Sequence, residues 1–353
     1  MKAAIQSPEN MHGSACCETT GENLIPVDIA LAKGGAMIVP SATIEYVPLM
    51  AAAGRILAAP ALTPRPMPPF DNSAMDGYAV RTADFAGRAA PHEVPLTGRI
   101  AAGDGWAEAD RAPAGTALRI LTGAPVPPSF DAVVMQERTE PGDDRVVLLE
   151  TPKPGQNIRR AGEDAPAGAL VIGAGGVIGA RQMAALAAIG LAKVPVFPRL
   201  RVAMFSTGSE LRQPGEALAP GQIYNSNRFT LAGMLDRPWI ELIDLGAVPD
   251  DPDRLADRLV HAASEADAVI TTGGVSVGDE DHMPRLLREA GGEIHAMKIA
   301  IKPGKPLTLG RLDEALYIGL PGNPVAVFVT MAVVGGPLLC RRAGLDRPHP
   351  PEL

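Results

Sequence analysis

One stretch of the sequence carries lysines in a pattern suited to binding anions. Lys298 and Lys302 alternate with apolar residues, and Lys305 follows across a Pro-Gly pair. Alternate side chains of an extended strand share a face, so Lys298 and Lys302 would reach two anionic groups about 13 Å apart, at roughly 3.3 Å per residue. A solvated edge strand is the alternative, and the stiffness of Lys-Pro-Gly-Lys-Pro favours anion binding over it.

A glycine-rich run over residues 272–281 could present backbone amides to a phosphate. Gly273 and Gly274 leave their N–H groups unobstructed, and Ser276 adds a hydroxyl. Such a nest of amides suits a phosphate or a pyrophosphate. The alternative is a tight strand-to-helix turn in which Asp281 caps the helix. The run matches neither a Walker motif nor GxGxxG, so it carries no nucleotide fingerprint.

Acidic residues follow several of the expected strands. Glu210, Asp250 and Asp281 come from separate strand ends and together could hold Mg²⁺ through water and substrate phosphate oxygens. Each of them alone suits a helix cap equally well. Asp250 and Asp251 compete for that position directly before Pro252.

Two turn-rich, charged segments lie in the first half of the chain, at residues 68–78 and 155–164. In the second of them, Arg159 and Arg160 could each bind a phosphate through two parallel hydrogen bonds. The alternative for both segments is a set of ordinary turns with exposed charge.

The C-terminal half alternates strands and helices, which predicts an open, mostly parallel α/β sheet with helices on both faces. Ligands of such sheets bind beyond the carboxyl ends of the strands, where the lysines, glycines and carboxylates above are expected. The expected strands are Arg201–Phe205, Ile240–Leu245, Ala268–Thr271, Met297–Ile301 and Ala315–Leu320, and the expected helices are Arg228–Leu235, Pro252–Glu265, Asp281–Ala290 and Val325–Leu339.

The N-terminal half changes character several times. Residues 1–24 indicate a flexible tail, and helical spacing over Val27–Leu31 and Ile44–Leu57 precedes a proline-rich break. Short apolar runs between Gly, Pro and Asp turns then predict a β-rich domain over residues 66–164. The segments 25–65 and 165–197, the latter with a helix at Ala180–Ile189, are expected to form a small linking domain, and residues 198–345 the α/β domain.

Composition excludes several classes of protein. The 353 residues carry a net charge of −8, which argues against a general nucleic-acid or anionic-membrane binder. The cysteines, Cys16, Cys17 and Cys340, cannot form a disulfide framework and share no zinc-ligand spacing with the histidines. No secretory signal is visible, and the apolar stretch 325–340 is broken by Gly335-Gly336-Pro337, so a cytoplasmic location is expected.

These residues together resemble one family, the molybdopterin molybdenumtransferases of the MoeA and gephyrin E-domain type. The resemblance covers about residues 25–340. It runs through the segments 70–80, 119–127, 133–137, 155–164, 206–211, 221–225, 272–281, 298–306 and 319–324.

The resemblance implies a molybdopterin-binding-like α/β fold and a role in molybdenum cofactor biosynthesis. The family hydrolyses adenylylated molybdopterin with Mg²⁺ and molybdate, and yields molybdenum cofactor and AMP. Its site is shared across a homodimer, which would make Asp76 and Thr122 act in trans. By motif position the catalytic candidates are Asp76, Thr122, Asp164, Glu210, Asp250 and Asp281, with Glu210, Asp250 and Asp281 as metal ligands. The substrate-binding candidates are Arg159, Ser206, Thr207, Gly208, Gly273, Gly274, Ser276, Lys298, Lys302 and Lys305.

The sequence departs from the family pattern in two places. Family members continue into a small C-terminal β-barrel that this sequence lacks, and Ala326 stands where the family usually has a serine near the molybdate. These departures leave other functions open. They are a molybdopterin carrier that serves a molybdoenzyme or a cofactor-chaperone partner, a metal-dependent pyrophosphate hydrolase, and a dimeric scaffold.

Overall fold

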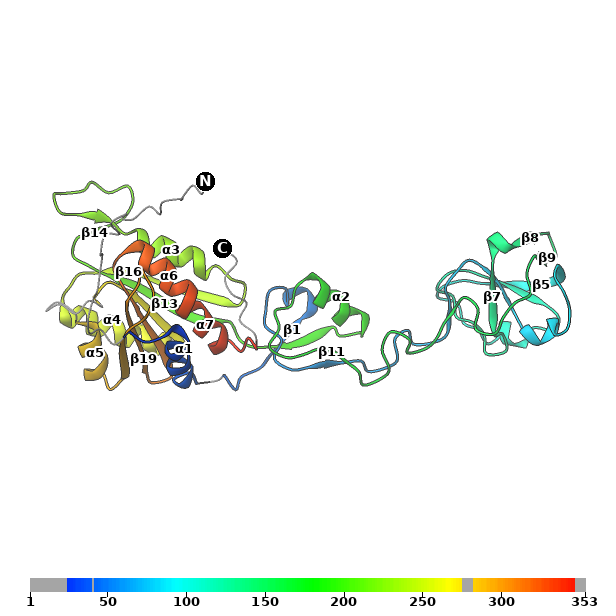
Figure 1. Ribbon diagram of the computed structural model, residues 1–353, viewed down its shortest axis with the longest axis horizontal. Helices are drawn as coiled ribbons and strands as arrows, with labels where there is room; N and C mark the ends of the chain where they lie inside the picture. The colour runs from blue at the N-terminus through cyan, green and yellow to red at the C-terminus, as the bar shows by residue number, and fades with distance from the viewer. Residues whose placement is uncertain (1–23, 40, 275–281, 347–353) are drawn as a thin grey trace, which may run out of the picture. The chain divides into compact units, whose positions relative to one another are not determined.

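The computed structural model describes residues 24–39, 41–274 and 282–346 (Figure 1). The chain divides into two compact units. The α/β unit comprises the described residues of 1–45, 54–56 and 197–353, and the β-rich unit comprises residues 46–53 and 57–196.

The α/β unit is built on a six-stranded sheet with the strand order β16-β13-β17-β20-β19-β18. Strands β16, β13, β17 and β20 are parallel to one another, whereas β19 is antiparallel to both β20 and β18. The bounds are β13 Leu200–Thr207, β16 Ile240–Val248, β17 Ala268–Thr272, β18 Glu293–Lys298, β19 Pro306–Leu312 and β20 Ala315–Leu320. The expected α/β fold class is confirmed.

Helices cover both faces of this sheet, because its strands alternate between two apolar cores. On β13, Val202 and Met204 belong to one core, while Ala203 and Phe205 belong to the other. Helices α1, α3, α6 and α7 lie on the first face, and α4 and α5 on the second (Figure 1). The bounds are α1 Val27–Ala36, α3 Ser226–Leu235, α4 Pro252–Glu265, α5 Met283–Glu289, α6 Pro324–Thr330, the π-helical turn η5 Met331–Gly335 and α7 Gly336–Arg342. A two-residue pair, β14 Leu211–Arg212 and β15 Ile223–Tyr224, completes the unit.

The strand predicted over Met297–Ile301 was wrong in its bounds, and β19 was not predicted. Strand β18 ends at Lys298, and residues 299–305 form the turn that leads into β19. The apolar alternation was correct, since Met297 and Ile299 are buried and Ile301 packs against the same core. Alternating burial therefore continues into a loop, where it no longer implies an extended strand.

The N-terminal segment also differs from the prediction. Residues 25–45, expected in the linking domain, fold with the α/β unit, because Ala30 and Met37 belong to its core. The helix expected over Ile44–Leu57 is wrong as well. Strand β1 (Glu45–Pro48) and the 3-10 turn η1 (Leu49–Ala51) occupy that stretch, consistent with the missing N–H of Pro48.

The β-rich unit contains a second six-stranded sheet, with the order β7-β4-β6-β5-β9-β8, and a smaller part made of short strand pairs and helix α2. Two cores, around Val134 and around Ile120, flank the larger sheet, and a third forms around Leu186 of α2. The strand bounds are β2 Ala61–Leu62, β3 Asn72–Ser73, β4 Gly77–Val80, β5 His92–Ile100, β6 Ala117–Ile120, β7 Ala132–Met135, β8 Thr139–Pro141, β9 Arg145–Leu148, β10 Ile158–Arg159, β11 Leu170–Ile172 and β12 Lys193–Val196. The helical bounds are α2 Ala180–Ala188, η2 Thr82–Phe85, η3 Ala109–Arg111 and η4 Gln136–Arg138.

Within the described part of the chain, the continuous helix Pro324–Arg342 is the one segment long and apolar enough to cross a membrane. Half of its most apolar window is buried inside the unit. It packs against the sheet through Val327, Val334 and Leu338, as the core helix of a globular domain does.

Burial of a histidine in the β-rich unit predicts a pH-dependent stability. His92 is 1% exposed, and its Nε2 lies 3.1 Å from Thr151 Oγ1. Burial, and secondarily the charge of Arg88, holds the pKa of His92 below its ordinary value. The unfolded chain therefore takes up a proton first, and the stability of this unit should fall as the pH drops below about 6.5.

Thermal unfolding followed by the fluorescence of Trp106 tests this. A Trp239→Phe background removes the tryptophan of the other unit. Between pH 7 and pH 5 the melting temperature should fall, and His92→Gln should reduce that fall. An equal fall with and without His92 would refute the assignment.

Candidate functional site

The strand register brings the predicted loops to one edge of the α/β sheet. Thr207 pairs with Val248, and Thr272 pairs with both Ser206 and Leu320, so the parallel strands end at one level. Strand β18 is antiparallel to β19, which is antiparallel to β20, so β18 runs parallel to β20. The turn that follows Lys298 therefore lies at the same carboxyl edge as the loops after the parallel strands.

A buried hydrogen-bond network ties three of these loops together. Thr272 Oγ1 donates to Ser206 Oγ at 3.0 Å, and Ser206 Oγ donates to Asn225 Oδ1 at 3.2 Å. The same Asn225 oxygen caps α3 by accepting from the Arg228 N–H at 3.2 Å. Ser206 was predicted to bind substrate, but it is only 2% exposed and its hydroxyl is engaged on both sides. Its observed contacts hold the loops in position.

The carboxylates after β13 and β16 lie on loops that are joined directly. The Ser209 N–H donates to Asp250 Oδ2 at 3.0 Å, and the Asp250 N–H donates to Ser209 Oγ at 3.2 Å. The carboxyl group of Glu210 lies over Gly208, where an added Cβ would come within 2.5 Å of Oε2. Both Glu210 and Asp250 are exposed. They are therefore open to a ligand at this edge.

The capping role left open between two aspartates falls to Asp251. Its Oδ1 accepts from the N–H groups of Asp253 and Arg254 at 3.1 and 3.2 Å, at the start of α4. Asp250 is consequently not the helix cap. It points instead into the loop that carries Glu210.

The start of the glycine-rich loop packs tightly on β13. Gly273 has φ of +86°, and a Cβ there would lie 2.6 Å from Thr207 O and 2.8 Å from Thr207 Oγ1. Only glycine fits such a close approach with this backbone conformation. Gly274 follows with φ of +65°. The remaining loop residues, including the predicted Ser276 and Asp281, lie outside the described residues.

A pocket of about 90 Å³ opens beside this contact. Its walls come from the ends of β13, β17 and β20, from β14 and β15, and from the first turn of α3. Asn227 Nδ2 donates to Gly322 O across it at 2.8 Å. Asn225 and Asn227 were not among the predicted site residues. Asn225 ends the resemblance segment 221–225 and is the N-cap of α3, and Asn227 is the second residue of that helix, so the sequence signal suits a helix start equally well.

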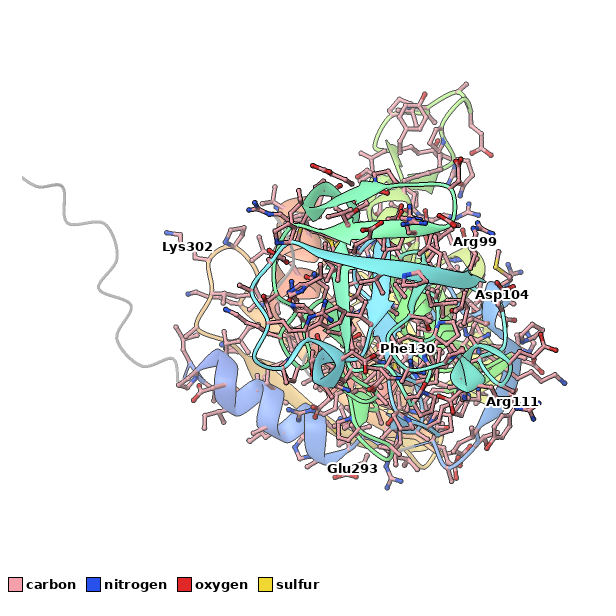
Figure 2. The ribbon with its side chains drawn as sticks, turned by 90° about the vertical axis from the view of Figure 1, so that its right-hand side faces the viewer. Arg99, Asp104, Arg111, Phe130, Glu293 and Lys302 are labelled. Atoms are coloured by element: carbon pink, nitrogen blue, oxygen red, sulfur yellow. The ribbon has the colours of Figure 1, made fainter. Side chains whose placement is uncertain are left out.

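The predicted anion-binding lysines belong to the β18–β19 turn. Lys302 is exposed and its side chain points away from the ribbon (Figure 2), while Lys298 and Lys305 are half-buried. The turn rests on α6: a Cβ on Gly304 would lie 2.5 Å from Thr330 Oγ1 and 3.5 Å from Ala326 O. Ala326, which is 3% exposed, is therefore next to this lysine turn.

Two predicted residues of the β-rich unit form a close pair. Asp76 Oδ1 accepts from both the N–H and the Oγ1 of Thr122, each at 2.7 Å. These hydrogen bonds, with a smaller contribution from Arg119, lower the pKa of Asp76. Arg119 is held nearby by bonds to Gly77 O and Gln136 Oε1. Asp76 is thus an ionised, exposed acceptor.

The other predicted residues of this unit pair with each other. Arg159 donates to Asp164, which raises the pKa of Arg159, and Arg160 donates to Asp71. An arginine in such a pair can bind an incoming phosphate only with its remaining N–H groups, or after it releases the carboxylate.

Neither the described part of the β-rich unit nor that of the α/β unit contains a cluster of three or more His, Cys, Asp or Glu residues that could hold a metal.

Comparison with known proteins agrees with this arrangement. Residues 25–190 match the family model "MoeA N-terminal region (domain I and II)", and residues 203–341 match "Probable molybdopterin binding domain". The chain is 42% identical to a molybdopterin molybdenumtransferase of Haemophilus influenzae, over 85% of this chain and 73% of that protein. A relative of the same name from Nostoc is 41% identical, over 86% of this chain and 70% of its own length.

The fold agrees with the sequence comparison. A crystal structure of a molybdopterin biosynthesis MoeA protein from Pyrococcus horikoshii superposes with a TM-score of 0.80 at 32% identity, covering 92% of this chain and 81% of that one. Both halves of the sequence, the carboxyl-edge loops and the relatives lead to one assignment. The chain belongs to the molybdopterin molybdenumtransferases, the enzymes of molybdenum cofactor biosynthesis of the MoeA type.

Proposed function

We propose that this chain inserts molybdenum from molybdate into adenylylated molybdopterin and releases AMP, with the substrate held at the carboxyl edge of the α/β sheet. The observation that carries the proposal is the register that brings the loop of Glu210 and Asp250 and the lysine turn to one edge. An anionic substrate with a phosphate and an oxyanion needs such a local positive group in a chain of net charge −8.

The lysine turn is the proposed binding site for the oxyanion and a substrate phosphate. Lys302 offers an exposed ammonium within the turn, between Lys298 at the end of β18 and Lys305, the last turn residue before β19. An ammonium is a compact charge that adapts to oxyanions of different shape. The methyl group of Ala326 beside the turn adds no hydrogen bond, so the oxyanion depends more strongly on the lysines.

Mg²⁺ is the proposed ion for the two carboxylates on the joined loops. Mg²⁺ in enzymes is commonly held by one or two carboxylates together with substrate phosphate oxygens and water, so a cluster of three acids is not required. Glu210 and Asp250 would hold it, with Asp281 as the predicted third ligand outside the described residues. The ion would supply positive charge to the phosphate oxygens during hydrolysis of the adenylate.

Ala326 also favours a second candidate, a carrier that binds molybdopterin without inserting metal. The two functions differ in one measurable respect. A transferase releases AMP in response to molybdate, whereas a carrier retains the adenylate. A rate of AMP release that does not depend on the molybdate concentration would instead indicate a pyrophosphate hydrolase.

Lys302→Ala tests the oxyanion site. With Mg²⁺ and adenylylated molybdopterin, the molybdate concentration that half-saturates AMP release should rise about tenfold or more, because an exposed ammonium that meets the oxyanion is lost. Lys33→Ala, an exposed lysine on α1, is the control and should change nothing. Equal molybdate dependence in both variants would remove Lys302 from the site.

Adjacent aspartates provide a second, matched test. Asp250→Asn keeps an acceptor for the Ser209 N–H but removes a metal ligand, so AMP release should fall about 100-fold or more with little loss of stability. Asp251→Ala should lower the free energy of unfolding by about 1 kcal/mol, because the cap of α4 is lost, and should leave AMP release unchanged. Rates and chemical denaturation are measured on both variants. The reverse pattern would assign catalysis to Asp251.

A homodimer with Asp76 and Thr122 acting on the partner subunit's substrate is the proposed assembly. Asp76→Asn and Asp250→Asn chains are each expected to be inactive alone. In a mixed population, a twofold dimer would rebuild one intact site in each heterodimer and recover about a quarter of the wild-type rate. The measurement is AMP release after co-expression of the two variants. No recovery, despite heterodimers detected by mass spectrometry, would place both residues in one chain's site.

A further inference from the structure

The pocket beside Thr207 holds a concentration of buried polar atoms that lack partners. Among the described residues, such side-chain atoms are Thr207 Oγ1, Asn225 Nδ2, Asn227 Oδ1 and the Nε atoms of Arg55 and Arg342. The guanidinium groups of both arginines make other hydrogen bonds. The three remaining atoms belong to residues that line the single 90 Å³ pocket. Buried polar groups are normally satisfied, so this grouping points to a ligand that completes them.

The hydrogen bonds that Asn225 and Asn227 already make determine which atom of each side-chain amide remains for a ligand. Asn225 Oδ1 accepts from Ser206 Oγ and from the Arg228 N–H, which leaves Nδ2 as a donor. Asn227 Nδ2 donates to Gly322 O, which leaves Oδ1 as an acceptor. The Thr207 hydroxyl can turn to serve either role. The pocket therefore presents a donor and an acceptor with assigned identities.

The residues that line the pocket and its volume further restrict the kind of ligand that fits. Ile223 and Tyr224, which are 54% and 45% exposed, give it a partly apolar side. Its 90 Å³ is room for roughly three waters at about 30 Å³ each, enough for the edge of a ring but not for a nucleotide. A phosphate fits poorly, because its oxygens cannot donate to Asn227 Oδ1 and because Glu210 also lines the pocket.

We propose that this pocket binds the polar edge of a pyrimidine ring of the substrate. Asn225 Nδ2 donates to a ring nitrogen or carbonyl, and an amino group or ring N–H donates to Asn227 Oδ1. This rests on the proposed function, since adenylylated molybdopterin carries such an edge on both its pterin and its adenine. Asn227 is then a residue that determines specificity for the ring.

The position of the pocket suits an elongated substrate. The pocket lies over the ends of β13, β17 and β20, whereas the lysine turn joins β18 and β19 at the far end of the sheet. The two are separated by about three strand spacings, roughly 14 Å at about 4.8 Å per strand. A ring at one end and an anionic group at the other would span this edge.

Binding to the full chain, measured by calorimetry without molybdate or turnover, tests the inference separately from the proposed reaction. The probes are pterin against lumazine, in which a carbonyl replaces the amino group, and AMP against purine riboside monophosphate, which lacks it. Wild type should prefer the amino form of one pair by about tenfold, and Asn227→Ala should abolish that preference. The pair that responds identifies the ring.

Asn227→Asp retains the acceptor but loses the hydrogen bond to Gly322 O, so it should keep the preference for the amino form even where it binds both members of the pair more weakly. A purely structural role for Asn227 would weaken both members of a pair equally, and that result would overturn the proposal. So would an unchanged preference in Asn227→Ala, or binding of Mg²⁺ alone that depends on Asn227. Loss of AMP release with the ring preference intact would count against the proposed reaction only.

Discussion

Burial of both faces of one sheet is the constraint on which the molecule's chemistry depends. Because successive residues of β13 belong to opposite cores, a shift of one residue would exchange its side chains between two cores that are each packed around a particular set. The register is therefore fixed, and with it the level at which each strand ends. At that level, buried hydrogen bonds link Thr272 to Ser206 and Ser206 to Asn225, and these bonds hold the loops together. The packing of the two cores therefore also fixes the position of the loops that form the site.

Charge is distributed unevenly along this edge. The carboxylates after β13 and β16 lie at one end, and the lysine turn after β18 lies at the other. An overall negative chain repels anions unless such a local concentration of ammonium groups outweighs it at close range. The strand order also places Glu210 and Asp250 several strands away from Lys302. The proposed substrate, with a phosphate and an oxyanion, would contact both ends.

Much of the α/β unit could be predicted because its signals are local. Helix α4 has the bounds that Pro252 and the Leu255–Leu259 spacing indicated, and β17 differs from its prediction by one residue. The β18–β19 turn could not be predicted, because buried isoleucines alternate through a loop as they do in a strand. Asn225 and Asn227 escaped notice for another reason. An asparagine at or next to the start of a helix suits a cap, and only the structure shows that one polar atom of its amide is left without a partner.

The long helix that closes the sheet contains an irregularity with a consequence for its two ends. An α-helix advances by about 100° per residue, so a regular helix locks the orientation of its last turn to that of its first. The π-helical turn Met331–Gly335 inserts a wider step between Ala326, beside the lysine turn, and Arg342, which is anchored by Asp267. The two ends are thereby put out of phase with each other. Each end can therefore be fitted to its own neighbours, one to the turn that carries Lys302 and the other to Asp267.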